Sequence, residues 1–248
     1  MDALTQSDSL REEDRALRRQ LGFSEFYKGD IHNTKNQQAE TADYENASLF
    51  LTNLPLFYSE RKLILALLPH GPFDRIYATS VTPPGVGHNG SSAKVVTFTR
   101  RGAERLYAFI VSGQFIVDGR RVRCVWNSIK QRAPNAAQYL SRVMIIRVQK
   151  AVLDEKRLIK LLNHNLVYQL EQDPKFTPAQ DDSDITQIEV RFCSFRAQAE
   201  AFRILLASEV PEAKVRFGID PLADDPKHSA NNPTVDKWAQ LGRFRRGG

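Results

Sequence analysis

The sequence predicts an α+β protein in which the order β-α-β-β-α-β occurs twice, each time as a four-stranded antiparallel sheet backed by two helices. From residue 47 onward, short runs with two-residue apolar alternation are interleaved with runs of helical period, and the same order of runs returns after residue 141. The 248 residues are 42% hydrophobic and 26% charged, which is typical of folded domains and leaves room for two small ones.

The first repeat is predicted over residues 47–131. Residues 49–54 alternate as a strand does, and Ser59 is a good N-cap for a helix through Leu68 because its hydroxyl can accept from a free backbone amide. The remaining elements are strands at residues 75–81, 93–99 and 121–126, a helix at 102–111 and a hairpin at 113–119. This repeat therefore has all six elements.

The second repeat is predicted over residues 141–222, after a linker at 132–140. Its elements are strands at residues 142–148, 167–171, 185–192 and 214–219, helices at 154–164 and 196–207, and an acidic loop at 173–184. Both repeats place an alanine five residues after a strand-ending phenylalanine, Ala103 after Phe98 and Ala197 after Phe192. This match supports a duplication.

The two ends are predicted to lie outside the folded repeats. Residues 1–46 are a polar, flexible leader whose Ser-x-x-Glu at residues 9–12 is a capping box for a short helix ending near Leu21. Residues 223–248 are predicted to be a disordered tail with a basic tip. No apolar run is long enough for a bilayer and no secretory signal is present, so we expect no membrane partner and a location in the nucleus, the cytoplasm or both. The two cysteines, Cys124 and Cys193, are expected to be buried reduced thiols.

The positive charge is concentrated in the first repeat. Residues 48–131 hold 11 Lys and Arg against 4 Asp and Glu, whereas residues 1–47 hold 6 against 10. This distribution predicts an anionic partner for the first repeat in particular.

The hexamer LFLTNL at residues 49–54 resembles the RNP2 hexamer of the RNA recognition motif (RRM) family, a ferredoxin-like fold. The whole chain is similar to the tandem RRM-like proteins common in filamentous fungi. The resemblance implies that single-stranded RNA crosses the open sheet face of the first repeat and that Phe50 stacks on a base, with Thr52 and Asn53 beside it.

The second RRM signature, RNP1, is degenerate. Its counterpart at residues 91–98 lacks the basic-glycine start and places Val95 where an exposed aromatic is expected. We expect compensation from Tyr77 as a second stacking ring, with Arg75 and Thr79 on its side of the strand. Arg121 and Arg123 either contact phosphates or bases or form a solvated basic edge, and Lys94 and Lys130 are further candidates for phosphate contacts. Trp126 is expected in the core. The resulting RNA affinity should be modest.

The second repeat departs further from the family pattern. Its RNP2 counterpart at residues 143–148 has Met144 in place of the aromatic and Arg147 in place of the asparagine, and Gln187 and Glu189 stand at the RNP1 stacking positions. Because a carboxylate repels phosphate, this repeat is predicted to be a pseudo-RRM with a structural or protein-binding role.

Two other function classes were weighed. Gly85, Gly87 and Gly90 match a dinucleotide fingerprint by letter, but no helix follows them, and the five histidines have no partners at metal-ligand spacing. The sequence thus predicts no enzyme, no cofactor, no metal and no catalytic residue. The alternative to RNA binding is a non-enzymatic protein-interaction module on the same scaffold, which would use an exposed apolar helix groove.

Overall fold

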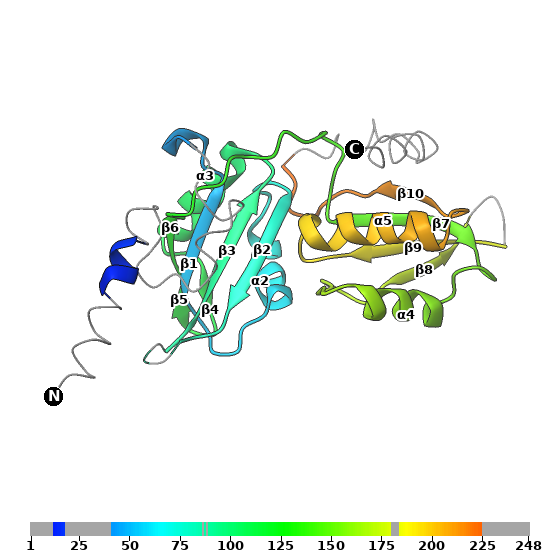
Figure 1. The fold of residues 1–248 in the computed structure, drawn as a ribbon, viewed down its shortest axis with the longest axis horizontal. Helices are drawn as coiled ribbons and strands as arrows, with labels where there is room; N and C mark the ends of the chain where they lie inside the picture. Colours follow the sequence, from blue (N-terminus) through cyan, green and yellow to red (C-terminus); the bar gives the residue numbers. More distant parts are fainter. Residues whose placement is uncertain (1–11, 18–40, 86, 88, 180–183, 225–248) are drawn as a thin grey trace.

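The computed structural model describes residues 12–17, 41–85, 87, 89–179 and 184–224. Within these residues the chain forms two four-stranded antiparallel sheets, each with helices on one face (Figure 1). The predicted fold class is confirmed. Residues 12–17 are helical, as expected for part of the leader, whereas the rest of residues 1–40 and the tail beyond residue 224 lie outside the described residues.

The first repeat has the sheet order β2-β3-β1-β6. Its elements are β1 (Ser48–Leu54), α2 (Glu60–Leu67), β2 (Ile76–Thr82), β3 (Ser91–Thr97), α3 (Arg100–Val111), the hairpin β4 (Ile116–Val117) and β5 (Arg120–Arg121), and β6 (Arg123–Trp126). A 3-10 turn precedes β1 at Asp43–Glu45 and another follows α2 at Leu68–His70.

Both helices of the first repeat begin at side-chain caps. The Ser59 hydroxyl accepts from the Lys62 amide at 3.2 Å, as the sequence predicts, and the Thr99 hydroxyl accepts from the Gly102 amide at 3.0 Å. Each helix buries one apolar stripe against the sheet: Leu63, Ile64 and Leu67 from α2, and Ala103, Leu106 and Ile110 from α3.

The second repeat has the sheet order β10-β7-β9-β8. Its elements are β7 (Val143–Gln149), α4 (Glu155–Asn165), β8 (Lys175–Pro178), β9 (Ile185–Arg191), a π-helical turn η3 (Phe195–Ala199), α5 (Glu200–Glu209) and β10 (Lys214–Phe217). The Asp154 carboxylate caps α4 by accepting from the Arg157 amide at 2.7 Å.

The second repeat differs from the prediction at three elements. The predicted strand at residues 167–171 forms only an isolated bridge between Leu170 and Phe192, and the edge strand β8 lies inside the segment predicted to be an acidic loop. The Glu171 amide still donates to the Arg191 carbonyl at 2.8 Å, and its carboxylate binds buried Arg142. The helix predicted from residue 196 begins at Glu200, because the preceding residues form the η3 turn, where Ala197 has φ +65°.

The two repeats share their hydrophobic cores. Phe98, directly after the third strand of the first repeat, packs in the core of the second against Phe195, with ring centroids 5.3 Å apart. Conversely, Cys193 and Leu222 of the second repeat lie in the core of the first. Burying apolar surface on both sides of the boundary stabilises one arrangement of the repeats, so the pair should unfold as one unit.

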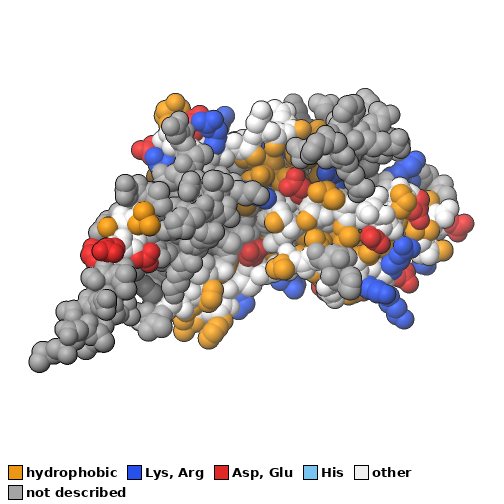
Figure 2. All heavy atoms as spheres, viewed as in Figure 1, with side chains coloured by type: hydrophobic (Ala, Val, Ile, Leu, Met, Phe, Trp, Pro, Cys, Tyr) orange, Lys and Arg blue, Asp and Glu red, His pale blue; other side chains and the backbone are white. Residues whose placement is uncertain are grey.

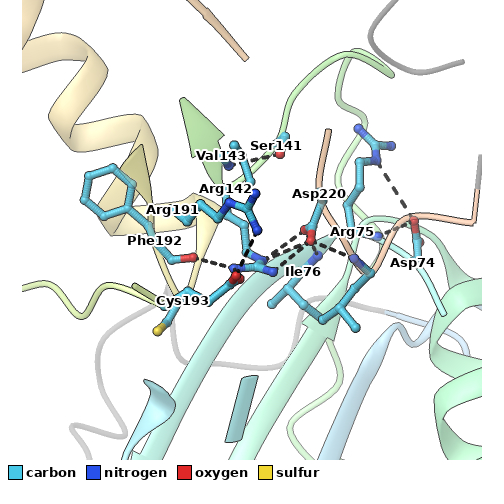
Figure 3. A network of polar contacts seen from close by, with 12 residues as sticks. Asp74, Arg75, Ile76, Ser141, Arg142, Val143, Arg191, Phe192, Cys193 and Asp220 are labelled. Atoms are coloured by element: carbon cyan, nitrogen blue, oxygen red, sulfur yellow. Dashed lines mark hydrogen bonds and ion pairs between the residues drawn. The ribbon is translucent and has the colours of Figure 1, made fainter. Parts of the chain in front are cut away.

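A buried ion network holds this boundary (Figure 3). Arg142 is fully buried, and its guanidinium donates to Asp220 at 3.1 Å, to Glu171 at 2.6 Å and to the Phe192 carbonyl at 2.8 Å. Asp220 also accepts from the Ile76 amide of the first repeat at 3.2 Å. Burial alone would lower the pKa of Arg142, but the charges of Asp220 and Glu171 outweigh it and raise that pKa.

Residues 218–224, here called the return segment, lead from β10 back to the first repeat. Leu222 is fully buried there, and its carbonyl accepts from the Phe73 amide at 2.9 Å. Asp224 forms an ion pair with Arg105 of α3 at 2.7 Å. Figure 1 shows the segment, in orange, passing between the two sheets. It ties the end of the second repeat to the first.

Candidate nucleic-acid interface

Cross-strand pairing defines the open face of the first sheet. Phe50 lies opposite Lys94 on β3 and Val125 on β6, and Thr52 lies opposite Arg123. Directly paired residues project from the same face of an antiparallel sheet, so these side chains lie together, away from the helices. Phe50, Thr52, Lys94, Arg123 and Val125 are here called the Phe50 face.

The Phe50 face is accessible and basic. The Phe50 side chain is 36% exposed and that of Val125 is 55% exposed, whereas Leu49 and Leu51, on the same strand as Phe50, are fully buried. Arg123 is exposed and Thr52 is partly exposed. An apolar ring beside a cation on an open sheet is the arrangement that binds a base by stacking and its phosphate by charge.

Asn53 bends the end of β1. Its φ is +64°, a left-handed conformation that asparagine tolerates better than most residues, and the β1–β3 register shifts there. Its side-chain amide donates to the Arg121 carbonyl at 2.9 Å. The asparagine of the hexamer therefore has a structural use here; an RNA contact by Asn53 stays a prediction.

The predicted position of Val95 on the open face is wrong. Val95 lies opposite Leu49 on β1 and Thr79 on β2, is fully buried and belongs to the core. The pairing places Val95 on the same face as buried Leu49 and Lys94 on the same face as Phe50. Lys94, a candidate phosphate contact from the sequence, is the residue that lies opposite Phe50 on β3.

Tyr77 is not available as a second stacking ring. Its ring meets Phe98 edge-on at 5.3 Å and lies 6.0 Å from Phe195 of the second repeat. Arg75 is also buried, with its guanidinium over the Phe98 ring at 4.3 Å. A bulge between Ile76 and Ala78 turns the strand, which places Thr79 toward the helices instead of beside Tyr77. The second repeat thus occupies this corner of the face.

The remaining predicted contacts lie away from Phe50. The Arg121 guanidinium packs against Gly113, in the turn that follows α3, so closely that a side chain at that position would clash with it. Lys130 lies beyond the end of β6 and pairs with Asp43 at 2.8 Å, a bond that lowers the pKa of that carboxyl. Trp126 packs on Tyr107 of α3 with ring centroids 5.1 Å apart, which confirms its predicted place in the core.

Lys94 is perturbed by its surroundings. Burial of the ammonium lowers its pKa, and the positive charge of Arg196 in the second repeat lowers it further. The same arginine also acts on the Tyr77 hydroxyl, whose pKa is raised chiefly by burial. Sequence reasoning missed Arg196 because it lies in a different repeat and was assigned to a helix.

The open face of the second sheet has a different character. Ile145, not Met144, occupies the position equivalent to Phe50, because Met144 is fully buried in the core. Glu189 and Gln187 lie on the open face as expected, opposite Ile145 and Arg147. The Glu189 carboxylate binds Arg191 at 2.6 Å. Within the described residues, this face presents no aromatic ring at these central positions.

Each sheet has four strands, which can be numbered one to four along the chain. In both sheets their order in space is second, third, first, fourth, and helices cover one face. Each repeat therefore has an RRM-like fold. This assignment comes from strand order, pairing and helix placement.

No protein-family model and no curated protein matches the sequence. Among solved structures, the chain is similar to RNA recognition domains 1 and 2 of Sex-lethal from Drosophila melanogaster, at 14% identity and TM-score 0.26 over 70% of this chain and 100% of that one. It is similar to the first two RRM domains of yeast poly(U)-binding protein Pub1, at 13% identity and TM-score 0.27 over 70% and 99%. The C-terminal RRM of RBM19 matches at 15% identity and TM-score 0.29 over 44% and 99%.

The described part of the chain contains no group of three or more His, Cys, Asp and Glu side chains that could hold a metal ion. Among the same residues, no helix has the length and apolar character needed to cross a membrane. Cys124 and Cys193 are both buried free thiols, as predicted, and burial raises the pKa of each to about 12.

Proposed function

We propose that the first repeat binds single-stranded RNA across the Phe50 face. The observation that carries the proposal is the outward projection of Phe50 in one cross-strand row with Lys94 and Val125, beside exposed Arg123. A ring on an open sheet stacks on any unpaired base, and the flanking cations attract the backbone. The basic composition of residues 48–131 supports the same partner.

The proposed binding is of modest affinity. Base stacking on an aromatic side chain contributes about 1–3 kcal/mol per base. On the Phe50 face one ring is available for stacking, because Tyr77 packs against Phe98 and Phe195. Charge attraction should then supply a large share of the affinity, so binding should weaken steeply as salt rises.

Phe50→Ala should weaken RNA binding by about 5- to 150-fold, the loss equivalent to one stacked base. The measurement is fluorescence anisotropy of labelled single-stranded RNA pools, titrated with the full chain at several salt concentrations. Phe57→Ala is the matched control, because Phe57 is 83% exposed in the loop after β1 and lies outside the cross-strand row. Equal affinity of the parent and Phe50→Ala would contradict the proposal, as would binding that does not depend on salt.

The alternative protein-interaction function has less support. It calls for an exposed apolar groove on the helices, yet Leu65 and Val111 are the large hydrophobic side chains that the described residues of α2 and α3 expose. Other exposed hydrophobic side chains, Leu56, Phe57 and Ile116, lie in the β1–α2 loop and β4, and Figure 2 shows such side chains at the lower end of this repeat. These positions form no helical groove.

A further inference from the structure

The η3 turn of the second repeat is fixed against the edge strand β2 of the first. The Thr79 hydroxyl donates to the Cys193 carbonyl at 3.3 Å, and the Ser194 hydroxyl lies 3.5 Å from the Tyr77 carbonyl. Phe195 then inserts its ring beside Tyr77 and Phe98. These contacts place the next residue, Arg196, at the boundary between the sheet of the first repeat and the second repeat.

The backbone of the turn presents Arg196 outward. Phe195 is 4% exposed, whereas Arg196 is exposed and has extended φ and ψ of −64° and 137°. Ala197 follows at φ +65°, a conformation that alanine adopts at a cost. The Ser194 hydroxyl stabilises this shape by donating to the Arg196 carbonyl at 2.7 Å. A strained, braced turn at a domain boundary is typical of a residue positioned for a ligand.

Lys94 approaches the same place from the first repeat. It lies opposite Ser80 on β2 and opposite Phe50 on β1, so it stands between the edge strand and the stacking ring. Both cations lie at the β2 edge, because Lys94 pairs with Ser80 and the neighbouring Thr79 holds Cys193, three residues before Arg196. Repulsion between the two positive charges helps to lower the pKa of Lys94. In the described part of the chain, neither cation has an ion-paired carboxylate. An anion held between them would relieve this repulsion.

We propose that Lys94 and Arg196 form one anion-binding site, shared by the two repeats, that takes a backbone phosphate of single-stranded RNA crossing the Phe50 face. This inference rests on the proposed function and extends it: the second repeat contributes a side chain to RNA binding. The phosphate lies on the β2 side of Phe50, whereas Arg123 lies on the β6 side. The second repeat covers Tyr77, which removes one stacking ring from the face, but it adds the positive charge of Arg196.

Arg196→Gln and Lys94→Gln should each weaken RNA binding about two- to fivefold, as loss of one partly exposed ion pair does. Each should also reduce the slope of log affinity against log salt by about 0.7, the value for one phosphate contact with a single strand. Arg101→Gln is the matched control, because it removes the same charge from the exposed surface of α3. Arg196→Lys should restore most of the slope, since it keeps the charge. All are measured by anisotropy with labelled single-stranded RNA pools.

The outcomes separate this inference from the proposed function. If the parent binds RNA, Phe50→Ala weakens binding, and Arg196→Gln matches Arg101→Gln in affinity and slope, then the shared phosphate site is wrong and the Phe50 face stands. If the parent shows no salt-dependent RNA binding, both proposals fail. A slope change in Arg196→Gln that Arg196→Lys reverses would support the site, because a merely structural role would not follow the charge.

Discussion

Replacing Arg142 by alanine should lower the free energy of unfolding by about 3–5 kcal/mol, because it leaves two buried carboxylates without their cation. Asp220 is 1% exposed and Glu171 is 3% exposed, and both face the guanidinium that the substitution removes. Glu171 keeps Arg191 at 3.2 Å, whereas Asp220 keeps hydrogen bonds from the Ile76 and Leu222 backbone amides. Urea denaturation followed by circular dichroism measures the loss.

Arg191→Ala is the matched control for this prediction. Arg191 binds the same glutamate, but its side chain is 24% exposed, so water can take its place. Its removal should cost about 1 kcal/mol. A loss for Arg142→Ala no greater than that for Arg191→Ala would show that the buried network does not hold the boundary between the repeats.

Leu222→Ala should cost about 2–5 kcal/mol, because it opens a cavity in the core of the first repeat. Leu222 is fully buried although it follows the last strand of the second repeat. The effect should therefore appear across the boundary: hydrogen exchange should accelerate at the amides of Phe73 and Ile76, whose acceptors lie on the return segment.

Ile219→Ala, on the same segment, is the control for Leu222→Ala. Ile219 is 48% exposed, so its truncation should change the free energy of unfolding by about 0.5 kcal/mol or less. Faster exchange confined to the second repeat, or separate unfolding transitions for the two repeats in the parent, would contradict the shared core.

The order of strands and helices could be predicted from the sequence because it depends on patterns among neighbouring residues. Alternation along β1 and the Ser59 cap of α2 are properties of neighbouring residues, and the structure has both. The edge strand β8 was missed because it contributes one partly buried aromatic, Phe176, to the core and so has little alternation. The burial of Val95 was not predicted because the face of a residue on β3 depends on the pairing with its partner strands.

The candidate site was predictable where it depends on one strand and not where it depends on the second repeat. Phe50 was identified from the hexamer and from its alternation with Leu49 and Leu51. Tyr77 was predicted to be exposed because nothing in its own strand reveals that Phe195 covers it. Arg196 was missed for the same reason. Contacts between residues more than 100 positions apart have no local signal in one sequence.

The most direct test of the central claim is an amide chemical-shift map of the full chain titrated with short single-stranded RNA. If RNA binds the Phe50 face, the largest chemical-shift changes should occur at the central strands β1 and β3. Smaller changes should occur at β6 and the η3 turn. Shifts confined to α2 and α3, or none at saturating RNA, would contradict RNA binding by this face and would favour the protein-interaction alternative.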